Sequence, residues 1–290
     1  MIAVAFPGQG VQHVGMVGNP SSYQLPYFSR ASELIGYDLL KLCQNGPIEQ
    51  LSNTRYAQVA IMVTCISHWA NLSQYAKPDV LLGHSLGELT ALVASGAIAF
   101  DDGVLIAAKR GELMDECGGE GRMAALLGLE LQTVETIVEQ AAEQGVIVVA
   151  NYNSPGQYVV AGEEKPIEYA SRLALEHGAK RVVRLPVSGP FHSPLMQKAA
   201  VQFAGYLQSF TFADPAIPVI SNVNSGLITR GDQVKMELVN QITSPVRWID
   251  NIQAVERMSV HKLIEVSPSS VLIGLVKRIT RSMELVIYPS

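Results

Sequence analysis

Ser85 lies in the stretch DVLLGHSLGELTAL, residues 79–92, between an apolar run and a helical pattern. The stretch Gly83-His84-Ser85-Leu86-Gly87 fits G-x-S-x-G, in which a sharp strand-to-helix turn exposes the serine and small neighbours relieve crowding. The free N–H of Leu86, at the start of the predicted helix, could bind an oxyanion. A serine that only caps a helix is the alternative, but the strand before it and the helix after it favour a nucleophile.

A serine nucleophile needs a base, and His192 is the histidine best placed to supply it. It lies downstream of the serine in the loop VSGPFHSPLM, between a predicted strand and a predicted helix. His84 adjoins the serine, but its side chain should point away from the hydroxyl in such a turn. His68 sits on an amphipathic helix, and His177 is near a helix C-terminus, where a histidine usually caps. The sequence therefore predicts that Ser85 and His192 act together.

The stretch FPGQG, residues 6–10, forms a glycine turn after the first apolar run. No Gly-Lys-Ser/Thr follows, which excludes a P-loop for phosphate. The other interpretation is that the backbone N–H of Gln9 is a second oxyanion donor, supplied from a neighbouring strand end.

Arg110 lies on a helix predicted over 101–117, on the side that carries Ile106 and Leu113 and away from Glu112. An arginine on an uncharged face should not be buried without an anionic partner. That partner could be a carboxylate of the chain in an internal salt bridge. It could instead be a substrate carboxylate, which the guanidinium would hold with two parallel hydrogen bonds.

These residues need a scaffold, and outside residues 122–188 short apolar runs alternate with longer helical patterns. The expected strands are IAVAF, DVLLG, IPVIS, KLIEV and LVIYP. The expected helices cover residues 55–74, 86–97, 101–117, 194–208, 231–243 and 269–280. The alternation predicts an α/β fold with a mostly parallel sheet covered by helices.

Residues 122–188 break this rhythm and follow the order β-α-β-β-α-β, which is typical of a ferredoxin-like unit. Its expected strands are RMAALLGL, VIVVANYN, QYVVAG and KRVVRLPVS, and its expected helices are LQTVETIVEQAAEQ and KPIEYASRLALEHG. We therefore expect an α/β core formed by residues 1–121 and 189–290, with residues 122–188 inserted as a subdomain.

Composition limits the remaining possibilities. The 290 residues are 48% hydrophobic and 16% charged, with a net charge of −5, so nucleic acid and anionic membranes are poor partners. The three cysteines (Cys43, Cys65 and Cys117) lack metal-ligand spacing and indicate reduced thiols in the cytoplasm. The opening MIAVAFPGQG is not a signal peptide, and no apolar window approaches 18 residues. We expect a soluble protein that does not cross a membrane.

Six ordered motifs between Val4 and Ile279 resemble those of malonyl-CoA:acyl carrier protein transacylases and polyketide synthase acyltransferase domains. They are FPGQG, GHSLGE, KRGELM, NSPGQYVVAG, GPFHS and SPVRW. The resemblance implies a hydrolase-like core with an inserted ferredoxin-like subdomain. It also implies transfer of malonyl from coenzyme A to the phosphopantetheine thiol of an acyl carrier protein, in fatty acid or polyketide biosynthesis. Malonyl-CoA would be a substrate, and no metal or redox cofactor would be needed.

The resemblance assigns a role to each site residue already singled out. Ser85 would accept the acyl group from coenzyme A, and His192 would act first as base and then as acid. Gln9 and Leu86 would supply the oxyanion N–H groups, and Arg110 would hold the malonyl carboxylate.

Two further positions follow from the resemblance alone. In this family a backbone carbonyl orients the histidine, and the corresponding residue is Gln241. Phe191, directly before the histidine, is similar to malonyl-selective members and would crowd bulkier acyl groups. The sequence departs from the family at residues 57–60, which lack a usual proline, and at 265–270, where EVSPSS replaces a glycine-rich turn.

Two other functions stay open. An acyl hydrolase would share the nucleophile, the base and the oxyanion hole, although Arg110 favours a substrate that carries a carboxylate. The second alternative function is a non-catalytic module that docks carrier proteins. The presence of both Ser85 and His192 argues against it. Acidic carrier proteins should bind a basic surface. The candidates for that surface are Lys180, Arg181, Arg184, Lys277, Arg278 and Arg281.

Overall fold

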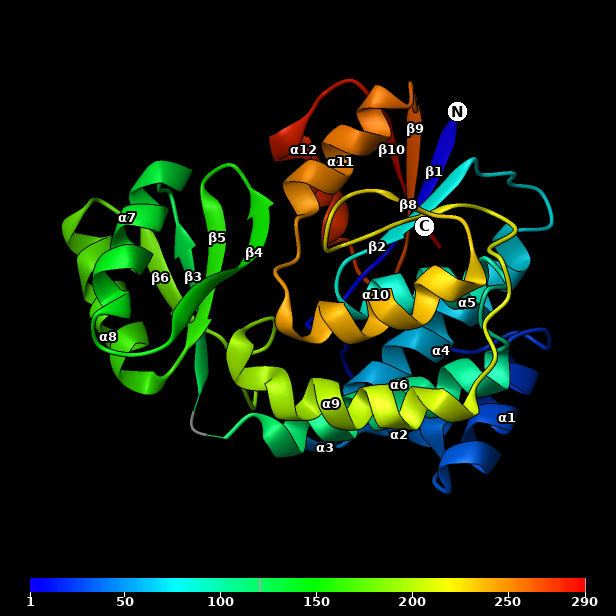
Figure 1. The fold of residues 1–290 in the computed structure, drawn as a ribbon. Helices are drawn as coiled ribbons and strands as arrows, with labels where there is room; N and C mark the ends of the chain where they lie inside the picture. Colours follow the sequence, from blue (N-terminus) through cyan, green and yellow to red (C-terminus); the bar gives the residue numbers. More distant parts are fainter. Residues whose placement is uncertain (120, 290) are drawn as a thin grey trace.

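A computed structural model describes residues 1–119 and 121–289; Glu120 and Ser290, inside the predicted core ranges, lie outside the described residues. Figure 1 shows a larger unit and a smaller unit, each built around a sheet of its own. The larger sheet has the strand order β10-β9-β1-β2-β7-β8, and only its β7–β8 pair is antiparallel. Its strands are β1 (Ile2–Phe6), β2 (Val80–Gly83), β7 (Val219–Ile220), β8 (Leu227–Ile228), β9 (Lys262–Val266) and β10 (Glu284–Tyr288).

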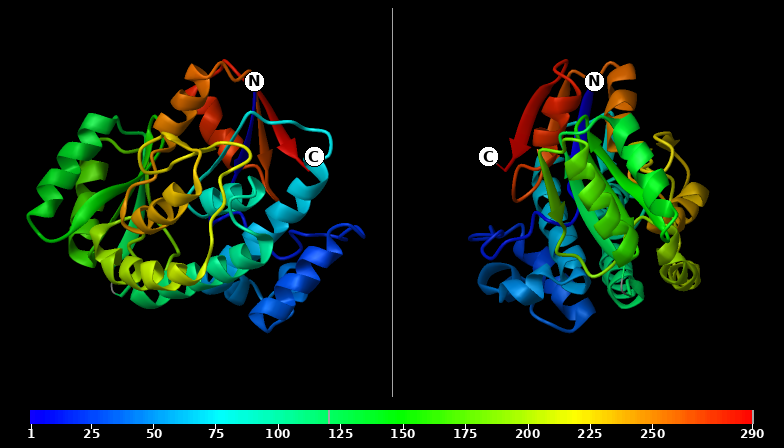
Figure 2. Two further views of the ribbon diagram at one scale, coloured as in Figure 1. Left: turned by 45° about the vertical axis from the view of Figure 1, so that its right-hand side comes forward. Right: turned by 90° about the vertical axis from the view of Figure 1, so that its left-hand side faces the viewer.

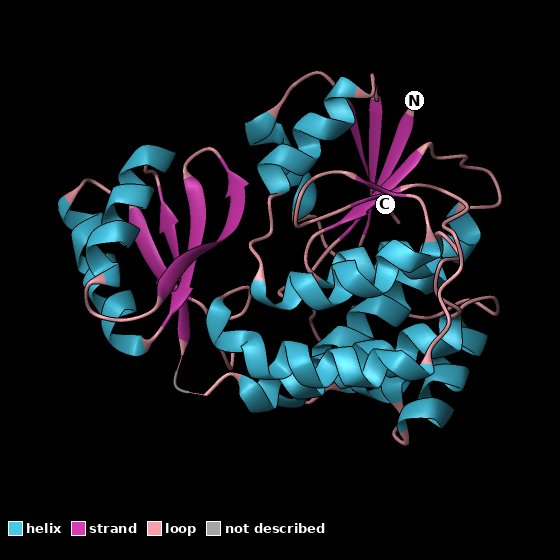
Figure 3. Cartoon of the chain, in the orientation of Figure 1, coloured by secondary structure: helices cyan, strands magenta, loops and turns pink. Residues whose placement is uncertain are grey.

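Helices cover both faces of this sheet, as Figure 3 shows by secondary structure. On one face are α1 (Leu25–Ile35), α2 (Leu39–Asn45), α3 (Ile48–Ser52), α4 (Thr54–Leu72), α5 (Leu86–Ala94), α6 (Phe100–Cys117), α9 (Gln197–Tyr206) and α10 (Gly231–Thr243). On the other are α11 (Trp248–Arg257) and α12 (Leu272–Ile279). Because both faces are covered, β1 is apolar throughout: Val4 and Phe6 pack on the first side, and Ala3 and Ala5 on the second.

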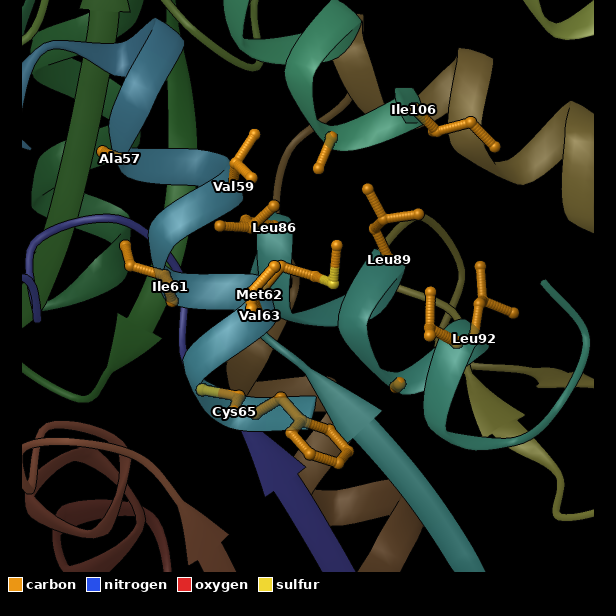
Figure 4. Close-up of a cluster of buried hydrophobic side chains, with 14 of the residues drawn as sticks. Ala57, Val59, Ile61, Met62, Val63, Cys65, Leu86, Leu89, Leu92 and Ile106 are labelled. Carbon is orange, nitrogen blue, oxygen red and sulfur yellow. The ribbon is translucent and has the colours of Figure 1, made fainter. Parts of the chain in front are cut away.

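The core beneath the sheet is centred on α4, whose side chains are buried around almost its whole circumference. A helix that is apolar all round belongs in an interior. Figure 4 shows its Val59, Met62 and Val63 beside Leu86 and Leu89 of α5. The start of α5, directly after Ser85, is therefore held on a rigid base.

The smaller unit is a four-stranded antiparallel sheet with the order β4-β5-β3-β6, and both of its helices lie on one face. Its elements are β3 (Arg122–Leu127), α7 (Leu131–Ala142), β4 (Ile147–Ser154), β5 (Gln157–Gly162), α8 (Glu164–Glu176) and β6 (Arg181–Arg184). The order β-α-β-β-α-β with this strand arrangement is the predicted ferredoxin-like topology. The fold class is confirmed, whereas the boundaries of the two folding units stay a prediction.

Strand β4 joins the two units. The backbone N–H of Tyr152 donates to the carbonyl of Val246 at 3.0 Å, and that of Val246 donates to Ala150 at 2.9 Å. Figure 2 shows the smaller unit beside the larger one in its left view and in front of the larger one in its right view. The site described below lies where β4 faces the carboxyl end of β2.

Several predicted elements have different bounds in the structure. The helix expected over 86–97 ends at Ala94, because Ser95 and Gly96 turn the chain. The helix expected over 194–208 is divided into three elements in the structure. A short 3-10 turn (Pro194–Met196) precedes α9, and a second one (Leu207–Ser209) follows it. Helices α1, α2, α3 and α11 and strand β8 were not expected. None of the described helices has the length and apolar character that a membrane span requires.

Candidate active site

The turn between β2 and α5 has no room for side chains at its two glycines. A Cβ on Gly83 would lie 1.9 Å from the carbonyl carbon of Gly87, and a Cβ on Gly87 would lie 2.0 Å from the carbonyl oxygen of Phe6. Between them, Ser85 has φ 52° and ψ −110°, a conformation that residues other than glycine rarely adopt. The glycines therefore permit a tight turn that presents Ser85 at the carboxyl edge of the sheet, directly before Leu86.

Ser85 and His192 are in hydrogen-bond contact, with 2.7 Å between Oγ and Nε2. The other ring nitrogen, Nδ1, lies 2.9 Å from the carbonyl oxygen of Gln241 and 3.2 Å from that of Ser244. Carbonyl oxygens only accept, so Nδ1 carries the proton and Nε2 is left to accept from the serine. Burial, with the nearby Arg110 cation, lowers the pKa of His192 to about 3. The ring is therefore neutral and able to act as a base.

This depressed pKa of His192 predicts a flat pH profile for Ser85 reactivity. Protonation would remove the base only near pH 3, whereas an ordinary histidine with a pKa of about 6.5 would lose roughly tenfold by pH 5.5. We expect the rate of Ser85 phosphonylation by a serine-directed fluorophosphonate to change by less than about twofold between pH 5.5 and 8. Intact-mass measurement at each pH checks this, and a tenfold fall toward pH 5.5 would contradict it.

Two backbone N–H groups flank the serine as candidate oxyanion donors. Parallel pairing aligns Phe6 of β1 with Gly83 of β2, which brings the turn after β1 beside the turn after β2. Among the described residues, neither the N–H of Gln9 nor that of Leu86 donates to another backbone group outside regular helices and strands. Both residues also line the cavity around Ser85. The pair is therefore available for an oxygen that develops negative charge.

Arg110 is 1% exposed, and its guanidinium is bound only by neutral oxygens. Nη1 donates to Oε1 of Gln58 at 2.8 Å, and Nη2 donates to Oε1 of Gln241 at 2.7 Å and to Oγ of Ser85 at 3.3 Å. Among the described residues, no carboxylate forms a salt bridge with it. Burial lowers the pKa of Arg110, and the charge of nearby Glu88 raises it again in part, so that the pKa is about 10. The Arg110 side chain is therefore a cation at neutral pH. This geometry favours a substrate anion over an internal salt bridge.

All of the predicted site residues except Gln241 line one small cavity of about 100 Å³. This small volume suits a short acyl group. Phe191 and His192 both contribute to its lining. The lining residues are Gln9, Gln58, His84, Ser85, Leu86, Arg110, Met114, Met123, Asn151, Leu185, Val187, Phe191 and His192.

Two glutamine side chains contribute contacts that sequence reasoning missed. Gln241 was expected only through its carbonyl, yet its Nε2 also donates to the backbone oxygen of Ser85 at 3.0 Å while its Oε1 accepts from Arg110. Gln58 lies in residues 57–60, for which the sequence indicated only the missing proline. This glutamine lies in the mostly apolar stretch AQVAIMV, and a buried amide there needs a polar partner.

The smaller unit also reaches the turn through His84. Its Nε2 lies 2.8 Å from Oδ1 of Asn153 on β4, and its ring centroid lies 5.7 Å from that of Trp248. Asn153 belongs to the motif NSPGQYVVAG, for whose residues the sequence predicted no role in the site. Burial lowers the pKa of His84, which favours the neutral form of this ring as well.

The six basic residues proposed as a carrier surface are all exposed. Two of them have partners: Arg184 pairs with Glu164, and Nη1 of Arg278 donates to Oε1 of Gln157 at 2.6 Å. The second contact joins α12 to β5 and so connects the two units.

Comparison with known proteins agrees with this geometry. Residues 5–287 match the family model described as an acyl transferase domain. The chain belongs to the acyl transferase family. The malonyl CoA-acyl carrier protein transacylase of Bacillus subtilis is 41% identical, covering 98% of this chain and 92% of that protein. The acyl transferase fold is shared with solved structures, and the predicted resemblance is confirmed.

Two of those structures are informative. An acyl carrier protein S-malonyltransferase from Vibrio cholerae has a TM-score of 0.95 and 41% identity, covering 99% of this chain and 96% of that one. A type II polyketide synthase acyl-carrier protein in complex with its malonyl-transacylase gives a TM-score of 0.95 at 34% identity, covering 99% of this chain and 95% of that one.

Proposed function

We propose that this acyl transferase moves a malonyl group from malonyl-CoA to the phosphopantetheine thiol of an acyl carrier protein, through an ester on Ser85. The observation that carries the proposal is Arg110, a buried cation 3.3 Å from the Ser85 hydroxyl and without a carboxylate partner among the described residues. A malonyl carboxylate would supply the missing anion, as a bidentate partner of the guanidinium. The names of the relatives support the same substrate and the same acceptor.

The first half-reaction forms the ester. Oγ of Ser85 attacks the thioester carbonyl while His192 Nε2 takes the hydroxyl proton. The backbone N–H groups of Gln9 and Leu86 would hydrogen-bond the carbonyl oxygen as it becomes negative. The C–S bond then breaks, and the departing coenzyme A sulfur takes the proton from His192.

The second half-reaction reverses these steps with a different thiol. The carrier protein thiol gives its proton to His192 and attacks the Ser85 ester. Its C–O bond breaks, and Oγ recovers the proton from the imidazole. Arg110 would hold the malonyl carboxylate in both halves, so the acyl group keeps its orientation while the thiol changes.

A hydrolase of the same fold would use water in the second step. The two functions share every catalytic group, but water needs no docking surface. An acyl hydrolase for neutral acyl groups would also gain nothing from Arg110. The acyl transferase proposal therefore rests on the cation and on the carrier complex of a relative.

Labelled malonyl-CoA distinguishes the functions directly. With carrier protein present, we expect label to move to its phosphopantetheine thiol, and without carrier protein we expect a stable adduct on the chain. Label released as free malonate at the same rate in both conditions would identify a hydrolase. Binding to the carrier protein with no label on either protein would identify a docking module.

The proposal needs no metal or redox cofactor, because both half-reactions are acyl transfers between oxygen and sulfur. We also propose a cytoplasmic location, supported by three cysteines that are present as thiols. Fatty acid and polyketide biosynthesis both use this reaction, and one relative is a polyketide biosynthesis protein of Burkholderia thailandensis.

A further inference from the structure

Asn222, just after β7, holds the nucleophile turn with both ends of its side-chain amide. Its Oδ1 accepts the backbone N–H of Ser85 at 2.8 Å, and its Nδ2 donates to the carbonyl of Gly83 at 2.6 Å. The residue is 0% exposed. One planar group thus fixes the peptide units on both sides of His84, immediately before the nucleophile.

Asn222 is itself fixed from two directions. Its backbone N–H donates to Oε2 of Glu88 at 2.7 Å, and its carbonyl accepts the backbone N–H of Arg247 at 3.1 Å. Glu88 is also 0% exposed and lies in the first turn of α5, where its own N–H donates to the carbonyl of Ser85. The contacts form a closed ring from Ser85 through Asn222 and Glu88 back to Ser85.

The turn needs such a restraint because Ser85 holds a positive φ of 52°. A residue in this region relaxes toward ordinary backbone angles unless its surroundings prevent it. Relaxation would rotate the Ser85 hydroxyl away from Nε2 of His192 and turn the N–H of Leu86 away from the acyl oxygen. A displacement of about 1 Å in such a constellation can cost roughly a hundredfold in rate.

We propose that Asn222 is a positioning residue that keeps the Gly83–Ser85 turn in its reactive conformation, with Glu88 as its anchor. The role rests on the proposed function, since it assumes that Ser85 is the nucleophile. Asn222 is not among the residues that line the cavity around Ser85, and its side-chain amide binds backbone groups of the turn. It acts on catalysis through the backbone of Ser85.

The test compares Asn222→Ala with a matched control, Asn251→Ala. Asn251 is equally buried and contacts Oγ of Ser225 at 2.6 Å in the same β7–β8 loop, but it does not touch the nucleophile turn. For Asn222→Ala, we expect kcat for malonyl transfer and the rate of Ser85 phosphonylation to fall together by about 10²-fold. The KM for malonyl-CoA should stay within about threefold, because acyl binding is not the interaction removed. Asn251→Ala should lower Tm. At temperatures below its unfolding transition, its rate of Ser85 phosphonylation should stay within about twofold of the rate of the parent protein.

Asn222→Asp adds a readout that a purely structural role would not move. A protonated aspartic acid can accept from Ser85 and donate to Gly83 as the amide does, but a carboxylate cannot donate. Burial and the neighbouring carboxyl groups of Glu88 and Glu237 favour the protonated form, and Arg110, whose charge acts on Glu88, is the opposing cation. We expect the phosphonylation rate of Asn222→Asp, relative to the parent protein, to rise at least about threefold as the pH falls from 8 to 5.5.

The outcomes separate this inference from the proposed function. A parent protein that is phosphonylated at Ser85 but takes no malonyl overturns the proposed function, while the variant rates still decide the role of Asn222. Equal losses in Asn222→Ala and Asn251→Ala, or a pH-independent ratio for Asn222→Asp, would overturn the positioning role. Absence of phosphonylation at Ser85 in the parent protein would overturn both. The near-isosteric aspartate variant also covers the case in which the alanine variant does not fold.

Discussion

Replacing Ser85 with alanine is expected to abolish the malonyl adduct, and replacing His192 with alanine to slow its formation by ~10²–10⁴-fold. In the proposed mechanism, Oγ of Ser85 carries the ester and His192 accepts its proton. The two side chains are 2.7 Å apart, and the second ring nitrogen of His192 is held by the carbonyl of Gln241. Intact-mass measurement after brief exposure to malonyl-CoA gives both results.

Two aspartates serve as matched controls for the histidine. Oδ1 of Asp214 accepts a hydrogen bond from the backbone N–H of Gly231 at 2.7 Å. Oδ2 of Asp250 lies 3.5 Å from Nη1 of Arg247 at the surface. Nδ1 of His192 faces the carbonyl oxygens of Gln241 and Ser244 instead, so Asp214→Asn and Asp250→Asn should be nearly silent. If either were as damaging as His192→Ala, orientation of the imidazole by a backbone carbonyl would be wrong. A malonyl adduct that is still formed by Ser85→Ala, or that maps to a cysteine, would refute the assignment of Ser85 as the nucleophile.

The parts of the site predictable from sequence are those with local signals. Ser85 has glycines at fixed offsets and a strand–helix context, and His192 follows a strand within a glycine-proline loop. The ferredoxin-like unit was predictable because each of its strands and helices has its own hydrophobic period. The parallel order of the larger sheet also follows from alternating strands and helices.

Asn222, Glu88 and Gln58 could not be assigned in the same way, because their roles depend on contacts between distant segments. Asn222 meets Ser85 across 137 positions of sequence, through the pairing of β7 with β2. The available signal was weak: a polar residue directly after a strand of a parallel sheet, at the edge where such sheets bind ligands. Helices α1 to α3 were missed for another reason, since their short apolar patterns are interrupted by glycines and prolines.

Arg110→Ala is expected to lower malonyl transfer by roughly 10²- to 4 × 10³-fold, from a loss of ~3–5 kcal/mol for one partner of a buried charged pair and ~1.4 kcal/mol per tenfold. Transfer of acetyl should stay level or rise, because the uncompensated cation is gone. The quantity to measure is the ratio of kcat/KM for malonyl-CoA to that for acetyl-CoA, in the variant and in the parent protein. Arg110→Lys should recover only part of the ratio, since an ammonium keeps the charge without the planar fork.

The ratio is needed because Arg110 does more than face the cavity. Its removal also leaves the side-chain oxygens of Gln58 and Gln241 without their donor, and the backbone of Gln241 orients His192. Any disturbance of the base would slow both acyl groups equally and cancel in the ratio, whereas loss of a carboxylate receptor slows malonyl alone. A ratio that stays constant while both activities fall would make Arg110 a structural partner of the two glutamines. The malonyl assignment would then lose the observation on which it rests.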